Sequence, residues 1–204
     1  MEYGDYIERN DAFIFELDDV LYPEKDYLLQ VYYLFAQFME YTEQLDGAAI
    51  TLFMRDVYER EGEVAIFFKT ATHFNIAEKY KFNFDLLHQN ARLPLKLLLF
   101  APVLDFLQQL IAAGKQVFLL TGGDLVQQLN KIRQVEWNGA EQHLLLYFTD
   151  EIARGSTANA VDIIIKKHAL TAGKVVFLGN RNEEQKKAFS NMLNFLDIDK
   201  LLLP

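Results

Sequence analysis

Three short segments place acidic, hydroxyl and glycine residues directly after runs of apolar residues. They are Glu16-Leu17-Asp18-Asp19-Val20, Thr121-Gly122-Gly123-Asp124 and Gly179-Asn180-Arg181-Asn182-Glu183-Glu184. Carboxylate oxygens are the ligands that a hard divalent cation such as Mg²⁺ prefers. A threonine hydroxyl and glycine amides at the start of a helix can hold an anion. These residue types therefore suit a site for a divalent cation together with a phosphate.

Each of these segments follows a predicted buried strand. The three strands are short and apolar, and they cover residues 12–16, 116–120 and 175–178. Between and after these strands the sequence predicts further elements. Apolar spacing indicates helices over 103–113, 125–137, 157–168 and 183–191, and short apolar runs indicate strands over 144–148 and 194–198. Alternating strands and helices with short connections predict a parallel α/β sheet. Because ligands of such sheets bind at the carboxyl ends of the strands, we expect the polar segments to converge there.

The stretch after the first strand has a different pattern. Apolar residues recur at helical spacing over 26–44, 48–60, 64–74 and 76–91, with a break at His73 or Asn75. This pattern predicts a helical block inserted into the α/β unit, covering the strand ends as a lid. Its aromatic residues Tyr32, Tyr33, Phe35 and Phe38 form the core of the block or, alternatively, line a specificity pocket.

Composition excludes several classes of function. The chain has 204 residues and a formal net charge of −9, which disfavours nucleic acid and anionic membranes as partners. It has no cysteine, so disulfides and thiolate metal sites are excluded. The first 11 residues lack the features of a signal peptide, and the greasiest segment, 93–107, is too interrupted to span a bilayer. We expect a cytoplasmic protein, either a monomer or a homodimer.

The polar segments resemble the motifs of the haloacid dehalogenase (HAD) superfamily. The segment from Phe15 to Pro23 is similar to the first motif of its phosphatases, Asp-x-Asp-x-Thr/Val, and the strand ending in Thr121 is similar to the second. Val175 to Asn180 is similar to the strand and Gly-Asp opening of the fourth. Any one motif is weakly specific, but their order and the helical insertion between them are distinctive.

The resemblance implies a fold and a chemistry. The fold would be a three-layer α/β/α Rossmann-like parallel sheet with an inserted α-helical cap, the core formed by residues 1–22 and 95–204 and the cap by 23–94. The activity would be Mg²⁺-dependent hydrolysis of a small phosphorylated metabolite. The expected catalytic residues are Glu16, Asp18 and Thr121. The resemblance also implies a phosphate site formed by Thr121, Gly122, Gly123 and Arg154, and a metal site formed by Glu16, Asp18, Asn180 and Glu184.

The chain departs from the family pattern at three positions. Glu16 stands where the nucleophilic aspartate is expected, and Asn180 stands where the fourth motif has an acid. No lysine occupies the place of the third motif, where Arg154 is the nearest substitute. A side chain one methylene longer moves its carboxylate by roughly an ångström, and a shift of that size can cost about 100-fold in rate. The departures indicate a weakened enzyme or, alternatively, an inactive HAD-like protein that binds a phosphorylated ligand or a protein partner.

Structural roles are open for the same residues. Glu16 could pair with Arg154 or Arg181, and Asp19 fits a turn better than a catalytic role, whereas Asp18 is in phase with Val20 and fits the motif. Further residues have a purely local alternative, with Asp124 as an N-cap of the following helix, Asn180 as a turn residue, and Glu183 and Glu184 as first-turn acids. The four histidines are scattered without ligand spacing.

Overall fold

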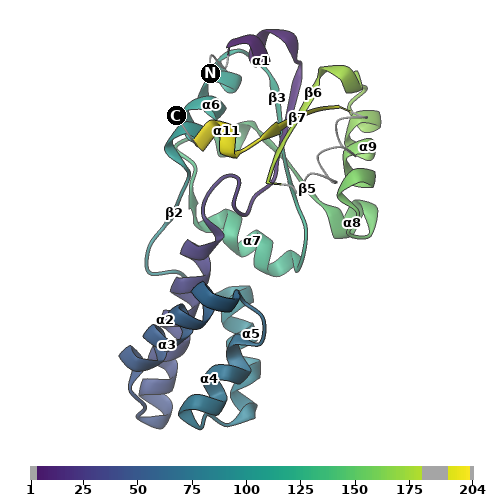
Figure 1. Cartoon of the computed structure of the whole chain (residues 1–204). Coiled ribbons are helices and arrows are strands. Elements are labelled where there is room, and N and C mark those ends of the chain that lie inside the picture. The colour runs from purple at the N-terminus through teal and green to yellow at the C-terminus, as the bar shows by residue number, and fades with distance from the viewer. Residues whose placement is uncertain (1–3, 181–192, 203–204) are drawn as a thin grey trace. The chain divides into compact units, whose positions relative to one another are not determined.

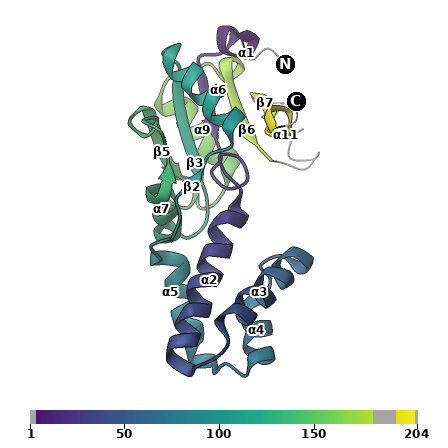
Figure 2. The same ribbon diagram turned by 90° about the vertical axis from the view of Figure 1, so that its left-hand side faces the viewer.

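The computed structural model describes residues 4–180 and 193–202, and Figures 1 and 2 show it from two sides. The chain divides into two compact units. The α/β unit comprises Met1–Pro23, Leu98–Gln128 and Val135–Pro204, and the helical unit comprises Glu24–Leu97 and Leu129–Gln134. The expected insertion covered 23–94, whereas this helical unit begins at Glu24, extends to Leu97 and also includes Leu129–Gln134.

The α/β unit is built on a five-stranded sheet in which every pairing is parallel. The strand order is β5-β3-β1-β6-β7. The strands cover β1 Ala12–Phe15, β3 Gln116–Thr121, β5 Leu144–Phe148, β6 Val175–Gly179 and β7 Asn194–Asp197. In the central strand, Phe15 lies level with Leu119 of β3 and Leu178 of β6. This register places the residues that follow β1, β3 and β6 at one edge of the sheet.

Alternate residues of β1 face opposite sides, which explains the three layers. Phe13 and Phe15 contact Phe106 of α6 (Ala101–Ala112), at ring-centroid distances of 5.7 and 6.3 Å. Ala12 and Ile14 belong to a buried cluster on the other face that includes Val161 and Ile164 of α9 (Thr157–Lys167), and Figure 1 shows α9 beside the sheet. Because both faces are covered, the strand residues are apolar without alternation. The other helical elements that lie wholly within the described part of this unit are short: α1 Gly4–Arg9, α8 Thr149–Ala153, α11 Asp199–Leu202 and the 3₁₀ turns η2 Glu141–His143 and η3 Ala172–Lys174.

The helical unit packs around aromatic side chains. Its elements are α2 Glu24–Glu43, α3 Gly47–Glu61, α4 Ile66–Phe74, the 3₁₀ turn η1 Glu78–Tyr80, α5 Lys81–Asn90 and the last part of α7 (Leu125–Gln134). Phe35, Phe67 and Phe84 come from three helices and lie with ring centroids 5.1–5.8 Å apart, mostly edge to face. Of the four aromatic residues expected in this core, Tyr32 and Phe35 are fully buried, whereas Tyr33 is 44% exposed.

Local signals explain most helix ends. The Asp46 carboxylate accepts the N–H of Ala49 at 2.9 Å and begins α3. Asn75 adopts a left-handed backbone with φ 55° and ends α4. Of the two residues expected to break the helical pattern here, His73 and Asn75, it is Asn75 that does so. The expected helix over 125–137 was too long, because α7 ends at Gln134 and the backbone turns extended at Val135. Val135–Glu136 then forms β4, which pairs with β2 (Leu97–Leu98). The expected helix over 183–191 lies outside the described residues.

Candidate active site

Glu16 directly follows β1, and its carboxylate lies against Gly179 at the end of β6. The Glu16 N–H donates to the carbonyl of Leu178 at 3.1 Å, so the backbone still follows the sheet. A Cβ atom built on Gly179 would lie 2.6 Å from Oε2 of Glu16, closer than real Cβ atoms approach a neighbour. The glycine therefore provides the space that the longer glutamate side chain occupies.

Asp18 and Thr121 belong to one hydrogen-bonded group. Gln128 on α7 is 6% exposed, and its amide nitrogen donates to Oδ2 of Asp18 at 3.3 Å while its amide oxygen accepts from the Thr121 hydroxyl at 3.1 Å. Oδ1 of Asp18 accepts from the Tyr22 hydroxyl at 2.6 Å. Two of the expected catalytic residues are thus held by a shared side chain, and this sets their separation and orientation.

The chain reverses between Asp18 and Tyr22, and here Asp19 has a structural role. Asp19 has a left-handed backbone with φ 57°, and its N–H donates to the Tyr22 carbonyl at 3.0 Å. Aspartate tolerates this conformation better than most residues. The turn carries the chain from β1 into α2 and brings the Tyr22 hydroxyl back to Asp18.

Gly122 and Gly123 form the turn between β3 and α7, and a carboxylate already accepts from one of its two amides. The Gly123 N–H donates to Oδ2 of Asp150 at 2.8 Å. Asp124 caps α7, accepting the N–H of Gln127 at 2.8 Å, as the local alternative for this residue anticipated. A phosphate at this turn would compete with Asp150 for the Gly123 amide, which leaves Gly122 as the better placed of the two expected donors.

The other expected residues lie around this edge or beyond the described part of the chain. Arg154 is exposed, ends α8 in a left-handed conformation, and forms no ion pair within residues 4–180 and 193–202. Asn180 is exposed and follows Gly179 directly. Glu184 lies outside the described residues, as do Arg181 and Glu183.

The expected metal ligands at this edge of the sheet are oxygen atoms, the type that a hard cation prefers, but among the described residues only two of them are carboxylates. Glu16 and Asp18 provide carboxylate oxygens two residues apart in the segment after β1, and Asn180, directly after Gly179, adds an amide oxygen. Within the described ranges, no group of three His, Cys, Asp or Glu side chains is arranged to hold a metal ion. A cation held here would rely on two carboxylates and on water.

The sequence analysis gave no site role to Gln128, Tyr22 or Asp150. Gln128 lies seven residues after Thr121, about one turn into α7, and its side-chain amide reaches back to the strand end. Tyr22 lies four residues after Asp18, a separation that only the intervening turn converts into contact. Asp150 lies in the first turn of α8, directly after β5, the strand next to β3, so the argument on strand ends that selected Thr121 applies to it as well.

The arrangement of the strands and flanking helices is that of the haloacid-dehalogenase-like fold, and comparison with solved structures shows that this chain has that fold. It is similar to a protein assigned as a β-phosphoglucomutase from Thermotoga maritima (16% identity, 94% of this chain and 96% of that one, TM-score 0.56). It is also similar to a protein assigned as a phosphoglycolate phosphatase from Lactobacillus plantarum (12%, 96% and 89%, TM-score 0.55). A haloacid dehalogenase-like hydrolase from Xanthomonas campestris gives a similar result (15%, 95% and 89%, TM-score 0.52).

At these identities the likeness establishes the fold and leaves the activity open. No protein-family model matches the sequence, and the search of curated proteins found no match. None of the described helices is long and apolar enough to cross a lipid bilayer.

Proposed function

We propose that this chain is a HAD-type hydrolase, a Mg²⁺-dependent phosphatase of a small phosphorylated metabolite whose rate is lowered by substitutions in its motifs. The observation that carries the proposal is the placement of Glu16, Asp18 and Thr121 at the carboxyl edge of the sheet, with Gln128 bridging the last two. The fold supports the same class of chemistry, because its solved neighbours include proteins assigned as a phosphatase and a phosphomutase.

In the proposed reaction, a carboxylate oxygen of Glu16 attacks phosphorus and the bond to the ester oxygen breaks. Asp18 gives a proton to the departing oxygen, so the alcohol leaves neutral. A water molecule then attacks the phosphorus of the glutamyl phosphate while Asp18 accepts its proton, and this step releases phosphate and restores Glu16. When a phosphate is bound, the single Thr121 hydroxyl proton would turn from the Gln128 amide oxygen to a phosphate oxygen, while the Gln128 amide nitrogen continues to donate to Asp18.

Mg²⁺ would neutralise charge on the phosphate when bound. Glu16 and Asp18 are the carboxylates that would hold it. Asn180 provides a neutral oxygen where an acid would add a third negative charge, so we expect weaker cation binding than a three-carboxylate site gives.

The experiment is hydrolysis of an aryl phosphate with and without Mg²⁺. We expect slow, Mg²⁺-dependent turnover that disappears in Glu16→Gln, because an amide cannot attack phosphorus. Gly173→Ala is the matched control, since Gly173 has open space around it in the same unit and lies on η3. Turnover that survives Glu16→Gln, or that needs no divalent cation, would exclude this mechanism.

A second candidate is an inactive HAD-like protein that binds a phosphorylated ligand without turnover. It is favoured by Arg154, which is exposed and forms no ion pair among the described residues, so its guanidinium can meet a phosphate. No turnover in the wild type, with turnover gained in Glu16→Asp combined with Asn180→Asp, would support this candidate. Phosphate-dependent thermal stabilisation of the wild type without hydrolysis would do the same.

A further inference from the structure

The helical unit contains a cavity lined mainly by polar and basic residues. Its volume is about 440 Å³, within the usual range for small-molecule sites. It lies where the end of α5, the segment 91–96 and the last turn of α7 meet, and its charged lining residues are Arg92, Lys96 and Arg133. No acidic side chain lines it among the described residues.

These three cations lack the carboxylate partners that most other cations of this unit have. Most lysines and arginines of the helical unit form an ion pair within it, namely Lys25, Arg55, Lys69, Lys79, Lys81 and Lys131. Arg92, Lys96 and Arg133 form none with any residue in the described ranges. Since the chain carries a net charge of −9, three adjacent unpaired cations are a local exception.

The segment that carries two of these cations is held in place by side-chain amides. The N–H of Leu93 donates to the Gln134 side chain at 2.5 Å, and the N–H of Leu95 donates to the Gln30 side chain at 2.7 Å. The carbonyl of Ala91 accepts from Asn130 and Gln134, each at 2.9 Å. A loop fixed at three backbone positions loses less entropy when a ligand binds, so the cavity is preorganised.

The ends of two helices account for only part of this charge. Arg92 follows the end of α5 and Arg133 lies in the last turn of α7, where cations complement the helix dipole. Each helix end carries roughly half a negative charge. Two such ends offset about one of the three positive charges, so an excess of about two remains for a ligand.

We propose that this cavity binds a small molecule whose phosphate groups carry at least two negative charges. Arginine pairs favour phosphate because their donors match two oxygens at once. The overall negative charge of the chain opposes long polyanions and favours a small ligand. This site is separate from the candidate active site and does not depend on the hydrolase proposal, because none of its lining residues belongs to the α/β unit.

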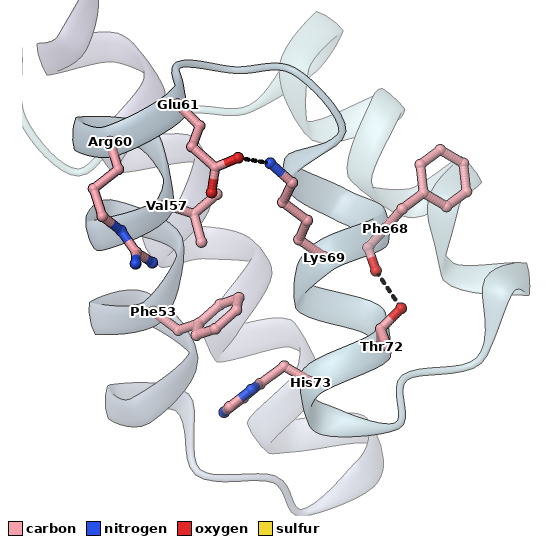
Figure 3. A pocket seen from close by; sticks show the side chains of 8 residues that line it. All are labelled: Phe53, Val57, Arg60, Glu61, Phe68, Lys69, Thr72 and His73. Atoms are coloured by element: carbon pink, nitrogen blue, oxygen red, sulfur yellow. Dashed lines mark hydrogen bonds and ion pairs between the residues drawn. The ribbon is translucent and has the colours of Figure 1, made fainter.

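Another cavity of the helical unit is less suited to an anion (Figure 3). Its volume is about 460 Å³, and it is lined by Phe53, Val57 and Phe68 together with basic residues. The Lys69 ammonium there is paired with the Glu61 carboxylate, and the His73 ring stacks on Phe53 with centroids 4.3 Å apart. Its Arg60 provides a matched control, because it is a cation of the same unit without a carboxylate partner among the described residues.

The experiment is calorimetric titration of the full chain with pyrophosphate in the presence of EDTA. Without a divalent cation the carboxylates of the candidate active site repel the ligand, so saturable binding reports the basic cavity. We expect one site, with affinity about tenfold or more weaker in Arg92→Gln and in Arg133→Gln, since each removes hydrogen bonds to a charged group. Arg92→Lys should retain part of the affinity, and Arg60→Gln should retain all of it.

Three outcomes would overturn the proposal. The first is no saturable binding by the wild type. The second is an equal loss in Arg60→Gln, which would indicate a general effect of charge. The third is equal affinity for citrate, which would show that the cavity selects negative charge without selecting phosphate. The circular dichroism spectrum of each variant should match that of the wild type, so that a loss of affinity is not caused by unfolding.

Discussion

Gly179→Ala tests whether the Glu16 side chain occupies the space above the last residue of β6. The new Cβ would lie 2.6 Å from Oε2 of Glu16 and 2.8 Å from Cε1 of Phe177. Gly179 is not one of the glycines with a positive φ, so its backbone suits alanine and the contacts alone oppose the change. Both distances are below ordinary van der Waals contact, so Glu16 or the strand must move.

Overpacking of this kind costs about 1–3 kcal/mol. For a protein of this length, each kcal/mol lowers Tm by about 2–4 °C, so we expect a decrease of about 2–12 °C in thermal denaturation. The displaced Glu16 should also lower any Mg²⁺-dependent turnover by about 100-fold, as a misplacement of about 1 Å can do. Gly173→Ala should leave both quantities nearly unchanged, because no atom lies within 4 Å of its built Cβ.

A double-mutant cycle assigns the effect to the right neighbour. Combining Gly179→Ala with Glu16→Ala removes one close contact and leaves the one to Phe177, so part of the stability should return, with a coupling of about 0.5–3 kcal/mol. An unchanged Tm in Gly179→Ala would refute the placement of Glu16 against Gly179. Additive effects in the cycle would show that Phe177 alone causes the loss.

Three further predictions concern buried polar groups. The Tyr32 hydroxyl is buried without a hydrogen-bond partner in the described structure, and burial raises its pKa well above the usual value, so Tyr32→Phe should stabilise the protein by up to about 1 kcal/mol in thermal denaturation. Burial lowers the pKa of His88 from 6.5 to about 4, so as pH falls through this range the unfolded chain takes up a proton before the folded chain does. The free energy of unfolding should therefore decrease between pH 6.5 and pH 4, by about 3 kcal/mol more in the wild type than in His88→Leu. Denaturant unfolding across that pH range measures the difference. Gln128→Leu should lower the free energy of unfolding by about 1–3 kcal/mol, because it leaves the buried Thr121 hydroxyl without its acceptor. In the hydrolysis assay, kcat should fall by a larger factor than KM changes, because Asp18 loses the amide that positions it. A variant with wild-type Tm and kcat would show that the bridge to Asp18 is unimportant.

The sequence predicted the sheet well because its strands are buried on both faces. Continuous apolar runs such as Ala12–Phe15 have few other stable solutions, and their order with the intervening helices determines a parallel arrangement. Helix ends were predicted where a local signal exists, as at Asn75. They were wrong at the end of α7, because Val135 leaves the helix to pair with β2 and no residue in that sequence signals it.

The sequence by itself determined the fold class and the positions of Glu16, Asp18 and Thr121, because strand order and strand ends follow from local apolar patterns. Only the tertiary structure decided which partners these residues have. Gln128, Gly179 and Asp150 lie 110, 163 and 27 residues along the chain from Asp18, Glu16 and Gly123, and packing alone brings them into contact. Side-chain contacts over such separations depend on how helices pack on the sheet, and that packing leaves no periodic mark in the sequence.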